Sequence, residues 1–403
     1  MRGVTSDERA VLERAAGEPM LAQVEAWAAV NSGSRNLAGL AAMAATYTDA
    51  FAALPGDVRL LDPSPIDAMT ADGSLEPLPH GQNLRLRARP EAAVQLLFTG
   101  HMDTVYGADH PFQSLSWREP GVLNGPGVAD MKGGIAVMLA ALKAVEASPL
   151  AAGLGYEIII NSDEEVGSPG SAALIADAAR GKRAALTYEP AALPDGTLAG
   201  ARPGSGNFSI YIAGRSAHAG RNPEDGRNAI VAAADLALRL AKAKGPRLSV
   251  NPARIEGGSP NNVVPDTAVL RVNMRPTTPE DQQRGQAQVE AAVAMVAAEH
   301  DVTIHVHGGF GRPPKPMDAK AQKLFELVRR CGADLGQSIG WQPIGGVCDG
   351  NNIAACGVPV VDTMGVRGGA IHSSDEYLIV ESLAERAQLS ALTILRIASG
   401  AAL

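Results

Sequence analysis

The chain has 403 residues, of which 46% are hydrophobic and 19% are charged, and its formal net charge at pH 7 is −8. A chain of this length can bury a large core and fold into two domains. The negative charge argues against nucleic acid or an anionic membrane surface as a partner, since both favour a basic protein face. No apolar run reaches the roughly 18 residues that span a bilayer, so we expect no membrane-spanning segment.

Cysteine usage bears on the cellular compartment. The chain has three cysteines, Cys331, Cys348 and Cys356, and their spacing forms neither a disulfide framework nor a CxxC zinc pattern. Residues 1–20 contain no apolar segment of the kind found in signal peptides. We therefore expect reduced thiols and a cytoplasmic location.

Residues 1–202 alternate between helical and strand patterns. Helices are predicted where apolar residues recur three and four positions apart, and buried strands where short apolar runs precede glycine or polar residues. The predicted helices are 20–30, 36–54, 131–145 and 170–180, and the predicted strands are 92–100, 155–162 and 183–190. This alternation predicts an α/β fold with a mostly parallel sheet flanked by helices.

The segment from about 203 to 313 has a different order of elements. Strand, helix, strand, strand, helix and strand are predicted at 207–214, 226–243, 248–258, 267–275, 278–300 and 302–310. This βαββαβ order is the ferredoxin-like pattern. We interpret residues 203–313 as an inserted domain, with 1–202 and 314–403 as the two parts of a discontinuous α/β domain.

Histidines and acids gather in the predicted loops. The strand "LLFTG" ends on His101 and Asp103, and further such residues follow in "GPGVADMKGG", "IIINSDEEVGS", "LTYEPA" and "GGAIHSSDEYL". Loops at the carboxyl ends of parallel strands meet at one edge of the sheet. Mixed imidazole and carboxylate ligands suit a divalent metal, and a bridging carboxylate would hold two ions about 3.5–4 Å apart. The further candidates are Asp130, Asp163, Glu164, Glu165, Glu189 and His372.

Glu164 and Glu165 are adjacent and follow a predicted strand. Successive side chains of extended backbone point in opposite directions. We therefore expect the two glutamates to differ in function, one binding metal and the other facing the substrate as a general base.

At these motifs the sequence resembles the M20 metallopeptidase family, which includes glutamate carboxypeptidase, acetylornithine deacetylase, succinyl-diaminopimelate desuccinylase and aminoacylase. "GHMDTV", "GPGVADMKGG", "SDEEVGS", "YEP" and "IHSSDEY" are similar to its five metal-site motifs and occur in the same order. The resemblance implies a zinc-peptidase-like catalytic domain and a site with two Zn²⁺ ions. Cobalt and manganese are alternatives, since such ligand sets accept several ions.

The resemblance also implies a role for each motif residue. Asp103 would orient a histidine ligand, Glu164 would be the general base, and the peptide bond after Asp130 would be cis. The implied ligands are His101 and Glu189 for one zinc, Glu165 and His372 for the other, and Asp130 between the two.

The inserted domain is similar to the family's lid and dimerisation domain. "GRSAHAGRNPEDGRNAI" resembles the lid segment whose histidine, here His218, stabilises the oxyanion, and which reaches across from the partner subunit in dimeric members. "NNVVP" implies that Asn262 contacts the substrate. "VNMR" ends at Arg275, at the spacing found in glutamate carboxypeptidase-like members, which implies a substrate-binding role. "GRPPKP" places Arg312 where those members bind a substrate carboxylate. We therefore expect a homodimer that hydrolyses a small amide or peptide and releases an amino acid with a free α-carboxylate.

Several alternatives stay open. Glu224 follows Pro223 where deacetylases and desuccinylases usually carry histidine, which favours the glutamate carboxypeptidase-like branch over an N-acyl amino acid deacylase or a dipeptidase. A non-catalytic metal-binding protein is the alternative from another class. "GQSIG" matches the serine-hydrolase pattern but lacks the preceding strand that this motif requires. His305 and His307 share one face of a strand, which we interpret as a polar sheet face, and we expect exposed His80, His110 and His300 side chains.

Overall fold

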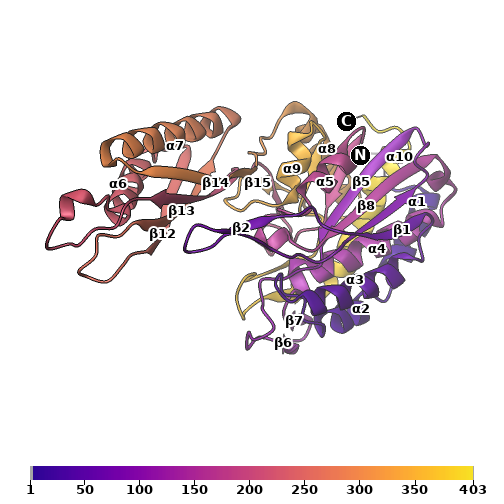
Figure 1. The fold of residues 1–403 in the computed structure, drawn as a ribbon. Helices are drawn as coiled ribbons and strands as arrows, with labels where there is room; N and C mark the ends of the chain where they lie inside the picture. The colour runs from indigo at the N-terminus through magenta and orange to yellow at the C-terminus, as the bar shows by residue number, and fades with distance from the viewer. Residues whose placement is uncertain (1–2, 403) are drawn as a thin grey trace.

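The computed structural model describes residues 3–402. Its largest sheet has six strands in the order β1-β4-β8-β5-β9-β16, in which β8, β5, β9 and β16 are parallel and β1 and β4 join antiparallel (Figure 1). The mostly parallel sheet predicted from the sequence is confirmed. The strands are β1 (Asp57–Leu61), β4 (Asn83–Ala88), β5 (Val94–His101), β8 (Leu154–Asn161), β9 (Ala184–Thr187) and β16 (Val360–Val361).

Helices cover both faces of this sheet. The larger core lies between one face and α1 (Ser6–Ala16), α2 (Met20–Ala28), α3 (Leu37–Phe51), α4 (Gly133–Glu146), α8 (Ala319–Asp334) and α10 (Glu381–Ala398). On the other face, α5 (Ala172–Ala179) and α9 (Asp349–Ala355) pack against Leu97, Ile159 and Ala185. Strands β5 and β8 are therefore apolar on both sides, which explains why they read as continuous hydrophobic runs.

A second sheet has four strands in the order β12-β13-β11-β14, all antiparallel. The chain order β11, α6, β12, β13, α7, β14 is the predicted βαββαβ pattern, and we call these residues the βαββαβ unit. Both helices cover one face of the sheet, and Figure 1 shows the unit projecting away from the six-stranded sheet. Its elements are β11 (Ser205–Ala213), α6 (Ala229–Lys242), β12 (Leu248–Gly257), β13 (Thr267–Pro276), α7 (Pro279–His300) and β14 (Thr303–Arg312).

Three small sheets were not predicted, because strands of two to four residues carry no periodic signal. One pairs β10 (Leu198–Ala199) with β15 (Trp341–Gln342). One has the order β17-β18-β7-β6, from Gly368–Gly369, Tyr377–Ile379, Val122–Asn124 and Ser116–Glu119. The third is a hairpin of β2 (Asp67–Met69) and β3 (Leu75–Pro77), which Figure 1 shows reaching toward the βαββαβ unit. No helix of the described residues is both long and apolar enough to cross a membrane.

Candidate active site

His101 is the last residue of β5 and is 1% exposed. Its Nδ1 lies 2.9 Å from the backbone oxygen of Asp103 and 3.4 Å from the carboxylate of the same residue. Its Nε2 lies 3.1 Å from Asp130 Oδ1 and 3.8 Å from Glu189 Oε2. The contacts of Nδ1 with Asp103 fix the orientation of the ring. Nε2 therefore points at two carboxylates that come from different loops.

Asp130 lies at the centre of the cluster. Its Oδ1 contacts His101, and its Oδ2 lies 3.3 Å from Nε2 of His372, which is also 3.1 Å from Glu165 Oε2. Each oxygen of one carboxylate therefore faces a different imidazole. The Asp130–Met131 peptide bond is cis, as the resemblance implied.

The other carboxylates come from the ends of two further strands. Glu164 and Glu165 follow β8, and Glu189 follows β9, so three strand ends and the His372 loop meet at one edge of the sheet. Two overlapping groups have ligand atoms within 4.8 Å of one another: His101, Asp130 and Glu165, and His101, Glu164 and Glu189. The predicted convergence of these loops is therefore confirmed.

Asp103 connects the two glutamates to His101. Its Oδ1 accepts a hydrogen bond from the backbone N–H of Glu164 at 3.1 Å, and its Oδ2 accepts one from that of Glu165 at 3.2 Å. The Ser34 hydroxyl donates to Oδ2 at 2.7 Å. Asp103 therefore positions the glutamate loop as well as the His101 ring.

Two positioning residues were missed from the sequence. Ser34 lies in a loop with no periodic signal, and only the fold brings it to Asp103. Glu376 is fully buried and accepts hydrogen bonds from the backbone N–H groups of Gly127, Ala129 and Asp130, at 2.9–3.1 Å. It therefore holds the loop that carries Asp130, and its place in "IHSSDEY" was the only sequence signal available.

The crowding of acids in a buried site changes their pKa values. Burial raises the pKa of Glu165 to about 8, and the neighbouring charge of Asp130 adds to the rise. Burial likewise raises the pKa of Glu164 to about 7, although Arg312 opposes the shift. Because buried carboxylates repel one another, a bound cation would favour the charged forms of both.

Metal binding should therefore depend on pH. Below about pH 7 both glutamates carry protons in the metal-free protein, and a cation must displace them. We expect the metal dissociation constant to rise at least tenfold between pH 8 and pH 6, since metal binding releases protons from its ligands. Isothermal titration with Zn²⁺ at both pH values, in two buffers of different ionisation enthalpy, measures the affinity and the protons released. An unchanged affinity with no proton release would contradict this expectation.

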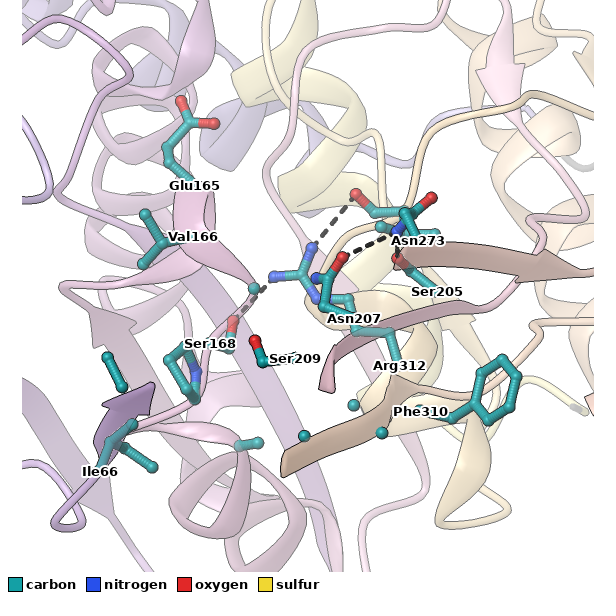
Figure 2. A pocket seen from close by; sticks show the side chains of 18 of the residues that line it. Ile66, Glu165, Val166, Ser168, Ser205, Asn207, Ser209, Asn273, Phe310 and Arg312 are labelled. Carbon is teal, nitrogen blue, oxygen red and sulfur yellow. Dashed lines mark hydrogen bonds between the residues drawn. The ribbon is translucent and has the colours of Figure 1, made fainter. Parts of the chain in front are cut away.

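A cleft of about 1140 Å³ opens beside the cluster (Figure 2). It lies between the loops that carry Glu164, Glu165 and His372 and the open face of the βαββαβ unit, which is the sheet face that its helices do not cover. Glu164, Glu165, His372, Arg275 and Arg312 all border it. Arg275 donates to the side chain of Asn273 at 3.2 Å and to the backbone oxygen of Gly345 at 3.1 Å. It thus offers a guanidinium to the cleft, held in place by neutral acceptors.

Arg312 is buried and ends β14. Its Nη2 lies 2.7 Å from Glu164 Oε1 and 3.3 Å from Asp349 Oδ1, and it donates to the Ser168 hydroxyl at 2.8 Å (Figure 2). Among the described residues its Nε has no hydrogen-bond partner. The arginine predicted to bind a substrate carboxylate therefore contacts the predicted general base in this state, with one donor still unused.

His218 and Asn262 lie together, away from the metal-ligand candidates. His218 pairs with Val263 in an isolated β-bridge, and the Asn262 backbone oxygen accepts from Ala219 N at 3.0 Å. Among the described residues that border the cleft, neither His218 nor Asn262 occurs. The structure therefore brings these two predicted residues to each other but not to the metal-site cluster of the same chain.

The histidines predicted to be exposed are less exposed than expected: His110 and His300 are half-buried, and His80 is buried. His80 is only 9% exposed, because its Nδ1 lies 2.9 Å from the backbone oxygen of Leu78 and its Nε2 lies 3.2 Å from Arg35. A loop histidine with both ring nitrogens bonded locally can be buried, and no local sequence pattern distinguishes it from an exposed one.

Comparison with known proteins agrees with a hydrolytic site. Residues 97–396 match the model of peptidase family M20/M25/M40. Carboxypeptidase G2 of a Pseudomonas species is 31% identical over 329 residues, which cover 79% of this chain and 78% of that protein. A succinyl-diaminopimelate desuccinylase of Maricaulis maris is 29% identical over 365 residues, which cover 81% of this chain and 90% of that protein.

Solved structures agree as well. The crystal structure of an aminopeptidase from Bacillus cereus matches with a TM-score of 0.69 and 25% identity, covering 96% of this chain and 99% of that one. The fold and the site thus define a hydrolytic enzyme of the metallopeptidase class. The chain belongs to peptidase family M20.

Members of this family use divalent metal ions, and the residues present fit such ions. The donor set is two imidazoles and several carboxylates, which is the chemistry that zinc and similar ions prefer. Glu189 belongs to this cluster, and its Oε1 is buried and has no hydrogen-bond partner among the described residues. A buried unpaired carboxylate oxygen is costly, and a cation would satisfy it.

Proposed function

We propose that the enzyme is a two-metal amidohydrolase of the glutamate carboxypeptidase-like type, which releases an amino acid with a free α-carboxylate. One observation carries the proposal: the two oxygens of Asp130 face two different imidazoles, His101 and His372, at 3.1 and 3.3 Å. This arrangement is what a carboxylate that bridges two ions requires. Glu189 would complete one ion's ligands and Glu165 the other's, and zinc is the proposed metal.

Bound zinc would supply a Lewis acid that polarises the scissile carbonyl and increases the acidity of water. Glu164 is the proposed general base. Its buried carboxylate borders the cleft, and burial gives it a pKa of about 7 in the metal-free chain, close to the value at which a base works at neutral pH. It would take a proton from water and deliver it to the nitrogen of the leaving amine.

Arg312 and Arg275 are the proposed partners of the substrate carboxylate. Both border the cleft, and a planar guanidinium matches a carboxylate with two parallel hydrogen bonds. In the absence of substrate, Arg312 contacts Glu164 and Asp349. An incoming carboxylate would compete for Arg312 and leave Glu164 free to act as a base.

We propose residues 203–313 as a lid and dimerisation domain, inserted between the two parts of the catalytic domain, 1–202 and 314–403. His218 and Asn262 lie at one place in this domain, outside the cleft of their own chain. In a homodimer they would act in the partner's cleft, where His218 would stabilise the oxyanion and Asn262 would contact the substrate.

An N-acyl amino acid deacylase is the second candidate, because succinyl-diaminopimelate desuccinylases match this chain with 26–29% identity. Both candidates use the same metal site and general base. They differ in the group that the arginine-bordered cleft accepts.

A substrate panel separates the candidates. The zinc-loaded protein is incubated with N-acyl and N-aroyl glutamates, dipeptides, N-acetylornithine and N-succinyl-diaminopimelate, and free amino acid is measured. We expect the glutamates to be preferred. The change Arg312→Ala should lower kcat/KM for them about 10- to 100-fold, the loss expected for a charge-assisted hydrogen bond of 1.5–3 kcal/mol.

Arg254→Ala is the matched control, since Arg254 is an exposed arginine on the same sheet. Preference for N-acetylornithine or N-succinyl-diaminopimelate would favour the deacylase. Equal losses in the two arginine variants would contradict the role of Arg312.

A further inference from the structure

The β2–β3 hairpin reaches from the α/β part of the chain toward the βαββαβ unit (Figure 1) and contacts the open face of its sheet. Nη2 of Arg271, on β13, donates to the backbone oxygen of Met69 at 2.6 Å. Nε2 of His307, on β14, lies 3.0 Å from the backbone oxygen of Asp67. Two side chains of the βαββαβ unit therefore hold the backbone of the β2–β3 hairpin, which lies outside this unit.

These contacts involve three of the four strands of the sheet. Ser209 on β11 is paired with Arg271 on one side and with His307 on the other, so the two contacts lie on the strands that flank β11. Asp67 and Met69 belong to the same short strand, β2. Strand β2 therefore runs across β14, β11 and β13 at the level of Ser209.

The same register places this crossing relative to the candidate active site. Ser205 on β11 pairs with Arg312, which contacts Glu164. Ser209 lies four residues further along β11, a distance of about 13 Å in an extended strand. Ile66, Met69 and Ser209 border the same cleft as Glu164, and Figure 2 shows Ile66 at the end away from Glu165.

Further contacts make this crossing stable. Arg271 also bonds Glu256 at 2.9 Å and the Ser209 hydroxyl at 2.7 Å, so each of its three side-chain nitrogens has a partner. In the turn of the hairpin, Gly73 packs on the ring of Tyr211. A Cβ atom added to Gly73 would lie only 2.1 Å from a carbon of that ring, so the two groups are in close contact. A two-stranded hairpin alone is marginally stable in water, so these contacts explain why mostly exposed strands keep their place.

We propose that the β2–β3 hairpin is the end wall of the substrate cleft and sets the maximum length of the substrate portion that lies along the open sheet face. The space between the Arg312 level and the hairpin is about 13 Å, the length of about four extended residues. The hairpin thus determines specificity for short substrates. This inference rests on the proposed function.

The test uses zinc-loaded protein and peptides of two, four, six and eight residues that consist of alanine with glutamate at the carboxyl end. In one variant two glycines replace residues 67–77, which is feasible because Leu78 N donates to the Ile66 oxygen at 2.8 Å. A second variant, Arg271→Ala, frees the hairpin without deleting it. Arg254→Ala is the control, since Arg254 binds the same Glu256 at 3.0 Å but does not contact the hairpin.

The measured quantity is the ratio of kcat/KM for the eight-residue peptide to that for the dipeptide. We expect this ratio to be at least about tenfold higher in both hairpin variants than in the wild type and the control. Unchanged ratios in variants with wild-type melting temperatures would overturn the end wall and leave the proposed function intact. Turnover of N-acyl glutamates without turnover of any peptide would overturn this inference alone. Absence of turnover on every peptide and every N-acyl substrate of the panel would overturn the proposed function and this inference with it.

Discussion

Glu164→Gln is expected to lower kcat by a factor of about 10³ while the protein keeps its bound metal, because general-base catalysis contributes about 10²–10⁴. Glutamine is nearly isosteric, and it removes the proton acceptor without changing the volume of the site. Arg312 would keep Asp349 and Ser168 as partners, so the loop should stay folded. Steady-state kinetics and elemental analysis of the same preparation measure both quantities.

The outcome of this change also separates two functions for Glu164. Its carboxylate lies in one of the two groups of potential ligands, with His101 and Glu189. A variant that loses one metal ion per chain would identify Glu164 as a ligand. Near-full kcat with the metal retained would contradict its assignment as the base.

Asp130→Ala is expected to abolish turnover and to release both metal ions, since among the described residues this carboxylate alone contacts both His101 and His372. Removing it would leave each ion one ligand short and would remove the negative charge between them. Elemental analysis after dialysis should find less than about 0.2 ions per chain, which corresponds to a loss of affinity of several kcal/mol.

Asp375→Ala is the matched control for this change. Asp375 lies in the His372 loop, but its side chain is exposed and pairs with Arg118 at 2.6 Å. It should keep both ions and the wild-type melting temperature. Retention of one tightly bound ion by the Asp130 variant would contradict the bridging role.

The larger elements were predictable because their patterns are long. The apolar run that ends at His101 gives β5, and the buried β8 ends just before the two glutamates. The βαββαβ order was also readable, since its helices and strands each exceed eight residues. Parallel strands bring their carboxyl ends to one edge, so the meeting of His101, Glu165 and Glu189 followed from the topology.

The contacts that position these residues could not be predicted. Ser34 reaches Asp103, and Glu376 binds the loop of Asp130, across separations in sequence that no local pattern records. The partners of Arg312 depend on how the βαββαβ unit meets the catalytic loops. The β2–β3 hairpin escaped prediction because its strands are three residues long and mostly exposed.

The most direct test of the proposed function is the number of divalent ions that each chain binds. Metal-free protein would be titrated with Zn²⁺, and hydrolysis of an N-acyl glutamate would be followed alongside elemental analysis. The proposal predicts two ions per chain and full turnover only when both are bound. A single ion per chain that supports full turnover, or turnover without any metal, would contradict it.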